Sequence, residues 1–520
     1  MASEPIISTD YWKNLQISKH DLEYLHTHLF EMETPLTTRE LVGVLIHERY
    51  RAESLAVQQR RQSGGKIYFP KESYRSGDSL VFPAMDWKHG EVSDSRPGTN
   101  PSLGEFDVLT VQMEDGTERL FASGLAAHSL NNEPVSDEEA EYDSAAILRS
   151  HGHAIDKKLE TTLKDDENIV RIAGRWFPRA LLIDVNVGNL NLAEAVLDMS
   201  GGEPLPTSAL LKDVSLPEGV NPKLAEFSLN LALQEDERFD EVGPAGEVLW
   251  CLHRLEPEGV RDIPFYLMYS ELDYDRTVLT EELINLEKLL DDELSDIEIN
   301  EETEPEVVTI PLIYPHLRAG TLPLSNRVQS LFPTAYEAPR VRFTLVDGKT
   351  EKRFPGWVVR EHKYVYGLLD FYKDNELMPG SLVSVRKGEI PGEVIIEAKN
   401  YRSTKDWLRT AIIGTDGIVV FAMLKQAVSA EFNERMAIAT PAFETVDQAW
   451  SQMAKRPLDQ LVVSMIREMS KLTPQGHVHA QELYSALNIV RRIPPAPLFA
   501  MLETKPEISH VGDLHYKLSE

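Results

Sequence analysis

Cysteine is nearly absent from this 520-residue chain, since Cys251 is the only one. A single cysteine excludes intramolecular disulfides and cysteine-rich zinc modules. No window approaches the roughly 18 apolar residues that a membrane-spanning helix needs. The opening residues, MASEPIISTDYWKN, have neither a basic start nor an apolar core and so do not indicate a secretory signal. We therefore expect a cytoplasmic protein, with Cys251 as a core thiol in the apolar run VLWCLHRL.

Sequence motifs of catalysis are also missing. We find no Gly-rich phosphate loop, serine elbow, His-Glu-x-x-His or paired-carboxylate pattern. Three His-x-His pairs do occur: His26/His28, His151/His153 and His477/His479. A metal site would need a third ligand, for which Asp156 near the middle pair is the best candidate. Surface histidines are the simpler interpretation, so we expect no catalytic activity, no cofactor and no metal ion.

Positive charge is scarce, because 53 Lys and Arg stand against 84 Asp and Glu, for a formal net charge of −31. Such a surface repels phosphates at long range, and contact with nucleic acid would need a local basic face. Two segments offer one. A helix over residues 47–61 carries Arg49, Arg51, Arg60 and Arg61. Residues 340–409 contain 14 Lys or Arg and 10 Asp or Glu, a net of 14 − 10 = +4.

The chain is too long for a single hydrophobic core, and its 42% hydrophobic content suits a folded protein of about three to five domains. Helical periodicity alternates with strand-like patterns along the chain. The segments are a helical stretch 1–62, a small β-barrel 63–132, an acidic helix and strand connector 133–187, a helix-rich module 188–256, an acidic helix and linker 257–306, a larger β-barrel 307–400, a mixed α/β connector 401–456 and a second helix-rich module 457–520. The barrel over 63–132 has about five short strands, with a hairpin at Glu114-Asp115-Gly116, and is SH3-like in size.

A supersecondary unit recurs in the helix-rich segments. The stretches PLTTREL at 35, PLPTSAL at 204 and HVHAQEL at 477 share an apolar second residue and a leucine at the seventh. Segments 188–256 and 457–520 each continue with a further helix and a two-strand ending, at 236–252 and 505–518. The order helix, strand, helix, helix, hairpin resembles the winged helix-turn-helix family. Segment 1–62 matches over two helices, then runs into QSGGKIYFP without an obvious wing, and is interpreted as a partial copy.

The resemblance implies DNA binding, because the third helix of a winged helix usually enters the major groove. The third helices of the second and third copies are acidic or apolar, which favours a role in packing or protein interaction. The helix 47–61 of the first copy differs because of its four arginines. It is either a phosphate-contacting helix or a solvated face, and the sequence leaves both open.

The segment 307–400 resembles the B3-type DNA-binding pseudobarrel, in which a short helix ends in a Phe…Asn-x-Leu-x-x-Gly-Asp pattern before a strand. Phe371, Asn375, Leu377 and Gly380 fill these places, whereas Ser381 stands where the family tends to have Asp. The resemblance implies that the cations able to face a groove and its phosphates are Arg342, Lys352, Arg353, Arg360 and Lys363. The alternative is an ordinary barrel whose basic residues balance the acidic linker 286–306, which could cover them.

The sequence thus predicts an α+β multidomain protein in which winged-helix-like units alternate with SH3-like and B3-like barrels. Its layout also resembles that of uncharacterised bacterial multidomain proteins, which supplies no activity. We expect a non-catalytic protein of transcription or DNA maintenance that contacts DNA or RNA through the helix 47–61 and the barrel 340–409. The alternative is an acidic scaffold that binds RNA polymerase or another basic complex, and a metal-dependent enzyme is a distant third. Membrane association is not expected.

Overall fold

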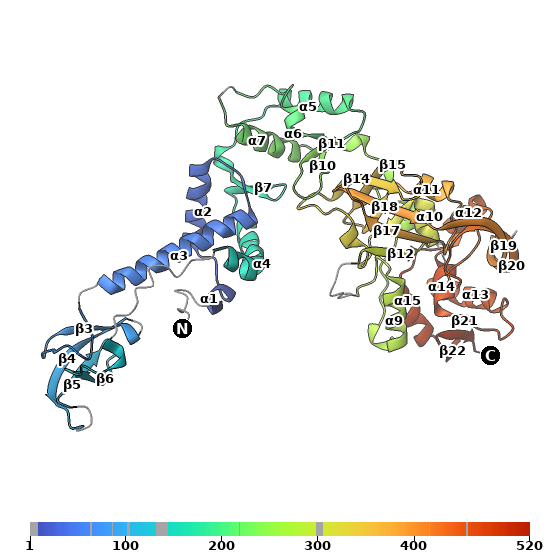
Figure 1. Cartoon of the computed structure of the whole chain (residues 1–520). Coiled ribbons are helices and arrows are strands. Elements are labelled where there is room, and N and C mark those ends of the chain that lie inside the picture. Colours follow the sequence, from blue (N-terminus) through green and yellow to red (C-terminus); the bar gives the residue numbers. More distant parts are fainter. Residues whose placement is uncertain are drawn as a thin grey trace. The chain divides into compact units, whose positions relative to one another are not determined.

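The computed structural model describes residues 9–62, 65–85, 87–100, 104–131, 144–217, 219–297, 305–414, 417–453 and 456–519, without the side chains of 9, 10, 53, 54, 56–62 and 451. The protein is an α+β chain with several separate sheets (Figure 1). It divides into two units, Met1–Arg171 with Arg175–Leu181, and Ile172–Gly174 with Leu182–Glu520. In the described ranges, no helix is both long and apolar enough to cross a membrane.

The first unit combines four helices with two sheets. Its helices are α1 (Thr9–Lys13), α2 (Lys19–Met32), α3 (Thr38–Gln62) and α4 (Ser144–Lys164). A five-stranded sheet runs in sequence order through β2 (Lys66–Ile67), β3 (Ser79–Phe82), β4 (Lys88–Pro97), β5 (Asp107–Met113) and β6 (Glu118–Ser123). The predicted hairpin is confirmed: β5 pairs antiparallel with β6, and Gly116 supplies the positive φ of +77 that the turn requires.

The remaining strands correct the interpretation of residues 1–62 as a partial copy. The short strand β1 (Leu36–Thr37) pairs with β8 (Arg175–Pro178), which pairs in turn with β7 (Ile169–Ile172). The copy is complete, because α4 is its third helix and β7–β8 its hairpin. The five-stranded sheet stands between the second and third helices, so the hairpin β7–β8 lies far along the chain from β1. We call this copy module one.

Two further modules have the same order of elements. Module two contains α5 (Val187–Met199), β9 (Leu205–Pro206), α6 (Thr207–Leu210), α7 (Pro222–Gln234), β10 (Phe239–Glu241) and β11 (Leu249–Leu252). Module three contains α13 (Leu458–Ser470), β21 (Val478–His479), α14 (Ala480–Leu487), α15 (Pro495–Thr504), β22 (Ile508–Gly512) and β23 (His515–Leu518). In all three modules the short strand pairs with the second strand of the hairpin, so the three small sheets share one topology.

The register explains the repeated sequence. The apolar second residue of each repeat lies opposite a large buried aromatic residue of the hairpin, in the pairs Leu36–Trp176, Leu205–Trp250 and Val478–Tyr516. The leucine at the seventh position is fully buried in every module. Each repeat therefore supplies one strand residue and one helix residue to the core of its own module.

A seven-stranded half-barrel sheet occupies the predicted larger barrel. Its order is β12 (Val307–Pro311), β17 (Leu382–Lys387), β18 (Glu393–Ala398), β14 (Arg340–Asp347), β15 (Arg353–Val359), β16 (Tyr364–Tyr366) and β13 (Thr321–Pro323). All the neighbouring pairs are antiparallel except β14 with β18. The helices α10 (Tyr314–Ala319) and α11 (Leu369–Asp374) accompany the sheet. At Gly380, φ is +92 and a Cβ atom would lie 2.5 Å from the Ala437 nitrogen, so only glycine fits there.

The second unit also contains three helices and a long hairpin within its described residues. The predicted acidic helix is α9 (Glu281–Leu290), which follows the short α8 (Glu258–Arg261). The segment expected to be mixed forms a long hairpin of β19 (Asn400–Ile413) and β20 (Val419–Ala430), followed by α12 (Phe443–Met453). The apolar side chains of α9, α12, β20 and module three lie in one core cluster. Module three thus shares its core with the neighbouring elements.

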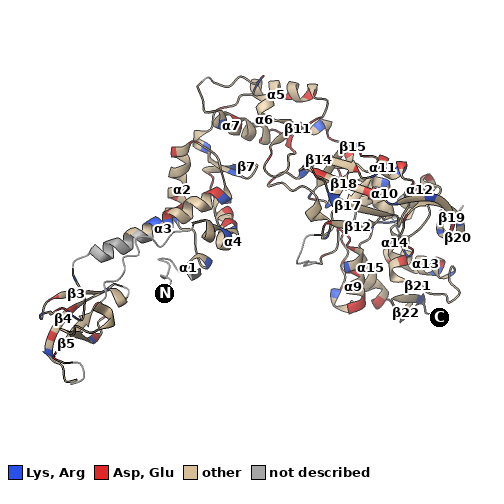
Figure 2. Cartoon of the chain, in the orientation of Figure 1, with Lys and Arg blue, Asp and Glu red and all other residues tan. Residues whose placement is uncertain are grey.

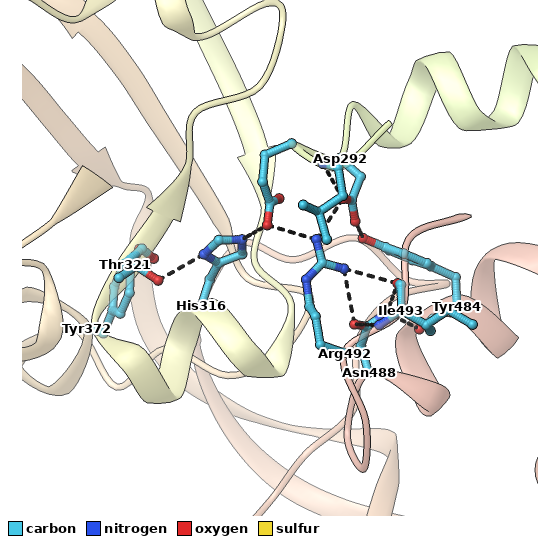
Figure 3. A network of polar contacts seen from close by, with 10 residues as sticks. Asp292, His316, Thr321, Tyr372, Tyr484, Asn488, Arg492 and Ile493 are labelled. Atoms are coloured by element: carbon cyan, nitrogen blue, oxygen red, sulfur yellow. Dashed lines mark hydrogen bonds and ion pairs between the residues drawn. The ribbon is translucent and has the colours of Figure 1, made fainter. Parts of the chain in front are cut away.

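A buried polar network ties module three to α9 and to the half-barrel sheet (Figure 3). The fully buried Arg492 guanidinium lies 2.6 Å from Asp292 Oδ1 and 2.8 Å from Glu293 Oε1. Glu293 lies 3.2 Å from His316 Nε2, whose Nδ1 is 2.9 Å from the Thr321 hydroxyl. Burial alone would raise the pKa of Glu293, but Arg492 and His316 together hold it well below its usual range.

Candidate nucleic-acid interface

The arginines predicted on helix 47–61 do not form one cationic face. Arg49 Nη2 donates to the buried carboxylate of Asp21 at 2.6 Å, and its Nη1 donates to the Tyr11 hydroxyl at 3.2 Å. Although burial opposes it, this pairing keeps the pKa of Asp21 below its usual value. Arg49 therefore joins α2 to α3.

The other three arginines of this helix have different surroundings. Arg51 is exposed but pairs with Glu48 one turn away, at 2.9 Å. Arg60 and Arg61 belong to the last turns of α3, where the structure does not describe side chains. Because successive helical residues are about 100° apart, Arg49 and Arg51 also point to different sides of α3.

The five predicted cations of the half-barrel lie in three separate places. Arg342 is 14% exposed, with its guanidinium carbon 5.7 Å from the centre of the Trp357 ring, and burial lowers its pKa. Arg353 pairs with Glu393 at 2.8 Å, while Lys352 lies 3.8 Å from Asp374. Both cationic and anionic residues occur on the elements of the half-barrel (Figure 2).

Arg360 and Lys363 are the pair that the structure does bring together. Both line a cavity of about 520 Å³, with Ser325, Asn326 and Gln329 among the other lining residues. Arg360 Nη1 already donates to the Ala338 carbonyl at 2.8 Å. The acidic linker 286–306 reaches this cavity, because Glu293 and Ser295 line it and Asn326 donates to the Ile297 carbonyl. Residues 298–304 of the predicted cover lie outside the described part.

A cationic helix face that the sequence interpretation missed lies on α4. The helix carries four Lys or Arg and two Asp or Glu, so the segment expected to be acidic contains a basic helix. Residues 132–143 before it lie outside the described residues. Gly152, Ile155, Leu159 and Leu163 form its buried side. The exposed side carries Arg149, His153, Lys157 and Lys164, which we call the α4 face.

Both carboxylates of α4 are neutralised by cations from its own or neighbouring elements. Asp156 pairs with Arg39 of α3 at 2.9 Å, and Glu160 pairs with Arg171 and with Lys164. Lys157 is exposed, and no carboxylate in the described ranges forms an ion pair with it. The α4 face therefore keeps a net positive charge in a strongly acidic chain.

The third helices of the other modules offer no such face. In α15, Pro495, Phe499 and Leu502 are buried, and so is nearly every other residue. The exposed part of α7 is short and includes a single cation, Lys223, in its first turn. Among the three described third helices, α4 is therefore the one with an extended exposed cationic side.

The three His-x-His pairs do not assemble metal sites within the described residues. His26 pairs with Asp166 at 2.8 Å, and Asp156, the suggested third ligand of the middle pair, pairs with Arg39 instead. His479 lies 2.7 Å from an Arg435 nitrogen; its burial, Arg435 and His515 lower its pKa to about 4.

One other group of potential ligands converges beside the hairpin of module two. Atoms of Asp240, His253 and Glu256 lie within 4.8 Å of one another. Arg340 Nη1 lies 2.9 Å from Asp240 Oδ2 and 3.5 Å from Glu256 Oε2. The Arg340 guanidinium thus lies where a metal ion would have to bind. The cluster is therefore an internal charge network.

Comparison with known proteins adds nothing to this geometry, because no family model, curated protein or solved structure matches the chain.

Proposed function

We propose that the chain is a non-catalytic nucleic-acid-associated protein of transcription or DNA maintenance. The shared element order of the three modules and their common sheet topology support this proposal. In it, the modules are winged-helix-like, the half-barrel sheet is a B3-like pseudobarrel and the five-stranded sheet is an SH3-like barrel. We further propose that module one contacts double-stranded nucleic acid through the α4 face, since α4 occupies the place of the groove-entering helix.

The observation that carries the proposal is the charge and exposure of α4. The helix has 21 residues, about 30 Å of length, which is enough to follow a major groove. Arg149 and Lys157 are both exposed, and Lys157 lies on the side opposite the buried stripe of α4. Lysine and arginine at such positions neutralise phosphates, which fixes the protein on a duplex without reading its sequence.

The test is a charge reversal on the α4 face. We expect the full-length protein to bind a mixed-sequence DNA or RNA duplex at low salt, and Lys157→Glu to weaken that binding several-fold. The slope of log affinity against log salt should fall by about 0.9 for each phosphate that the variant no longer neutralises. Fluorescence anisotropy over a series of salt concentrations measures both quantities.

The matched control is Lys223→Glu, which reverses the charge at an exposed position of the third helix in module two. This variant should bind the duplex as the wild type does. The proposal fails if the wild type does not bind a duplex even at low salt, or if both variants lose affinity equally.

The second candidate is the acidic scaffold for RNA polymerase or another basic complex. It is favoured by module three, whose third helix is buried in the chain's own core, as in a packing module. A pull-down after nuclease treatment that returns one stoichiometric partner, together with absent duplex binding, would support the scaffold instead.

A further inference from the structure

The hairpin β19–β20 is a long two-stranded ribbon, and each of its faces is covered over part of its length. The strands pair without interruption from Thr404 opposite Val428 to Ile413 opposite Val419. Residues directly opposite each other share a face, and the faces alternate along each strand. Leu408 and Val428 belong to one face and form a buried cluster with Ala437 and Ala439.

The other face carries an exposed tryptophan between cations, and we call it the Trp407 face. Trp407 is 62% exposed and lies opposite Lys425, whose Nζ is 5.5 Å from the centre of the indole ring. Lys405, Met423 and Ala427 on the same face are also exposed. Nearer the turn of the hairpin, this face is buried in the core that the ribbon shares with module three, through Ala411, Val419 and Phe421.

Charge on this ribbon is separated by face. The register places Asp406 on the side opposite Trp407, where it accepts a hydrogen bond from the Thr404 hydroxyl. The next cation of the Trp407 face, Arg409, is 14% exposed and pairs with Glu482 of α14. That pair fixes the base of the ribbon to module three. Within the described ribbon, the open part of the Trp407 face therefore contains lysines and apolar groups but no carboxylate.

Trp407 stands outside the buried core of the described residues. The other six tryptophans are buried or half-buried, and most contribute to core clusters. An exposed aromatic ring flanked by lysines is the arrangement that stacks an unpaired base and neutralises the adjoining phosphates. A duplex cannot supply this contact, because its bases are already stacked on each other.

We propose that the Trp407 face binds single-stranded nucleic acid, with a base stacked on Trp407 and phosphates beside Lys405 and Lys425. This inference deepens the proposed nucleic-acid function but uses a site in the other unit. Loss of duplex binding through α4 would not remove it, and its failure would leave the α4 proposal intact.

The experiment titrates the full-length protein with oligothymidylate and oligouridylate of about 16 nucleotides at low salt. Anisotropy reports binding, and quenching of tryptophan emission reports contact at Trp407, the most exposed indole. We expect Trp407→Ala to weaken binding about tenfold or more and to abolish the quenching. Trp407→Phe should retain most of the affinity, because a phenyl ring still stacks. The DNA and RNA strands together show which sugar is preferred.

Two further variants separate stacking from general charge. Lys405→Ala with Lys425→Ala should reduce the salt slope by about 0.7 for each phosphate left without its lysine. Phe265→Ala, which removes an aromatic ring 50% exposed elsewhere in the same unit, should change nothing. The proposal is overturned if neither strand binds at low salt, or if Trp407→Ala binds as the wild type does. It is also overturned if polyglutamate binds as tightly and in a Trp407-dependent way, since the face would then recognise acidic protein.

Discussion

Glu256 is a buried carboxylate for which neither oxygen accepts a hydrogen bond within the described structure. Burial raises its pKa to about 8; the neighbouring Asp240 adds to the shift, and Arg340 opposes it. Glu241, in the same module, has its pKa raised to about 8 by burial as well. Both groups therefore retain a proton in the folded protein at pH values where they are ionised in the unfolded chain.

The sign of the resulting pH dependence follows from proton binding. Between about pH 4.5 and 8 the folded state holds protons that the unfolded state has lost, so stability falls as pH rises through this window. Glu256→Gln keeps the shape of the side chain and removes one titration. We expect this variant to match the wild type near pH 5 and to be more stable near pH 9, by about 1.4 kcal/mol for each unit of the pKa shift at most.

Urea denaturation followed by tryptophan fluorescence over this pH range measures the difference, and Trp250 in the core of module two is a suitable reporter. If Glu256→Gln were equally destabilised at every pH, the side chain would be ionised and held by Arg340, contrary to the inference.

At the scale of the elements, modules one and two share a hydrogen-bonded contact between a tryptophan of the hairpin and the start of the second helix. Trp176 Nε1 donates to the Thr38 hydroxyl at 2.9 Å, and Trp250 Nε1 donates to Asn230 at 2.9 Å and to the Thr207 hydroxyl at 3.2 Å. Thr38 and Thr207 are the first residues of α3 and α6. In module two, Asn230 provides a second acceptor for the indole.

Because module two has this second acceptor, we expect a Thr→Val substitution to cost less stability there than in module one. Thr38→Val leaves the buried indole of Trp176 without an acceptor, which costs about 1–3 kcal/mol. Thr207→Val should cost less, because Asn230 still accepts from Trp250. Thermal unfolding of the two full-length variants measures the contrast, and equal losses would show that the hydroxyls act through packing alone.

Local signals were enough for most elements, whereas long-range pairing was not. The repeats at 35, 204 and 477 revealed the second helices, and the endings at 236 and 505 revealed two hairpins, because each pattern is contained within a few residues. The hairpin β7–β8 was assigned to a connector because a five-stranded sheet separates it from β1 along the chain. No periodicity encodes a strand pair across such a separation.

The same holds for the candidate sites: local features could be predicted from the sequence, whereas tertiary contacts could not. The sequence identified Arg49 and Arg342 as cations, but only the fold shows that one pairs with Asp21 and the other faces Trp357. It missed α4, whose acidic flank concealed its basic face, and Trp407, whose exposure depends on which part of the ribbon is covered. Charge can be counted from sequence, but its availability depends on tertiary contacts.

At the scale of the whole molecule, Arg492 decides whether module three stays docked on α9 and the half-barrel sheet. Its guanidinium neutralises Asp292 and Glu293, which are themselves buried (Figure 3). The Tyr484 hydroxyl also donates to Asp292, so residues of α14 and of the α14–α15 connection meet the end of α9 at one point. The carboxylates are tolerable there only while the arginine is present.

We therefore expect Arg492→Met to destabilise the second unit by about 3–5 kcal/mol, because two buried carboxylates lose their counter-charge. Adding Asp292→Asn and Glu293→Gln to this variant should recover part of the loss, although His316 then loses a charged partner. Arg491→Met is the matched control, since Arg491 is half-buried and its guanidinium donates to the Arg456 carbonyl. Chemical denaturation of the three variants checks this order. A similar loss of stability in Arg491→Met would mean that the aliphatic parts of the two arginines stabilise the contact between module three and α9. In that case the apolar helix α15 would hold module three in place. The buried charges would then lower the free energy of unfolding that this packing provides.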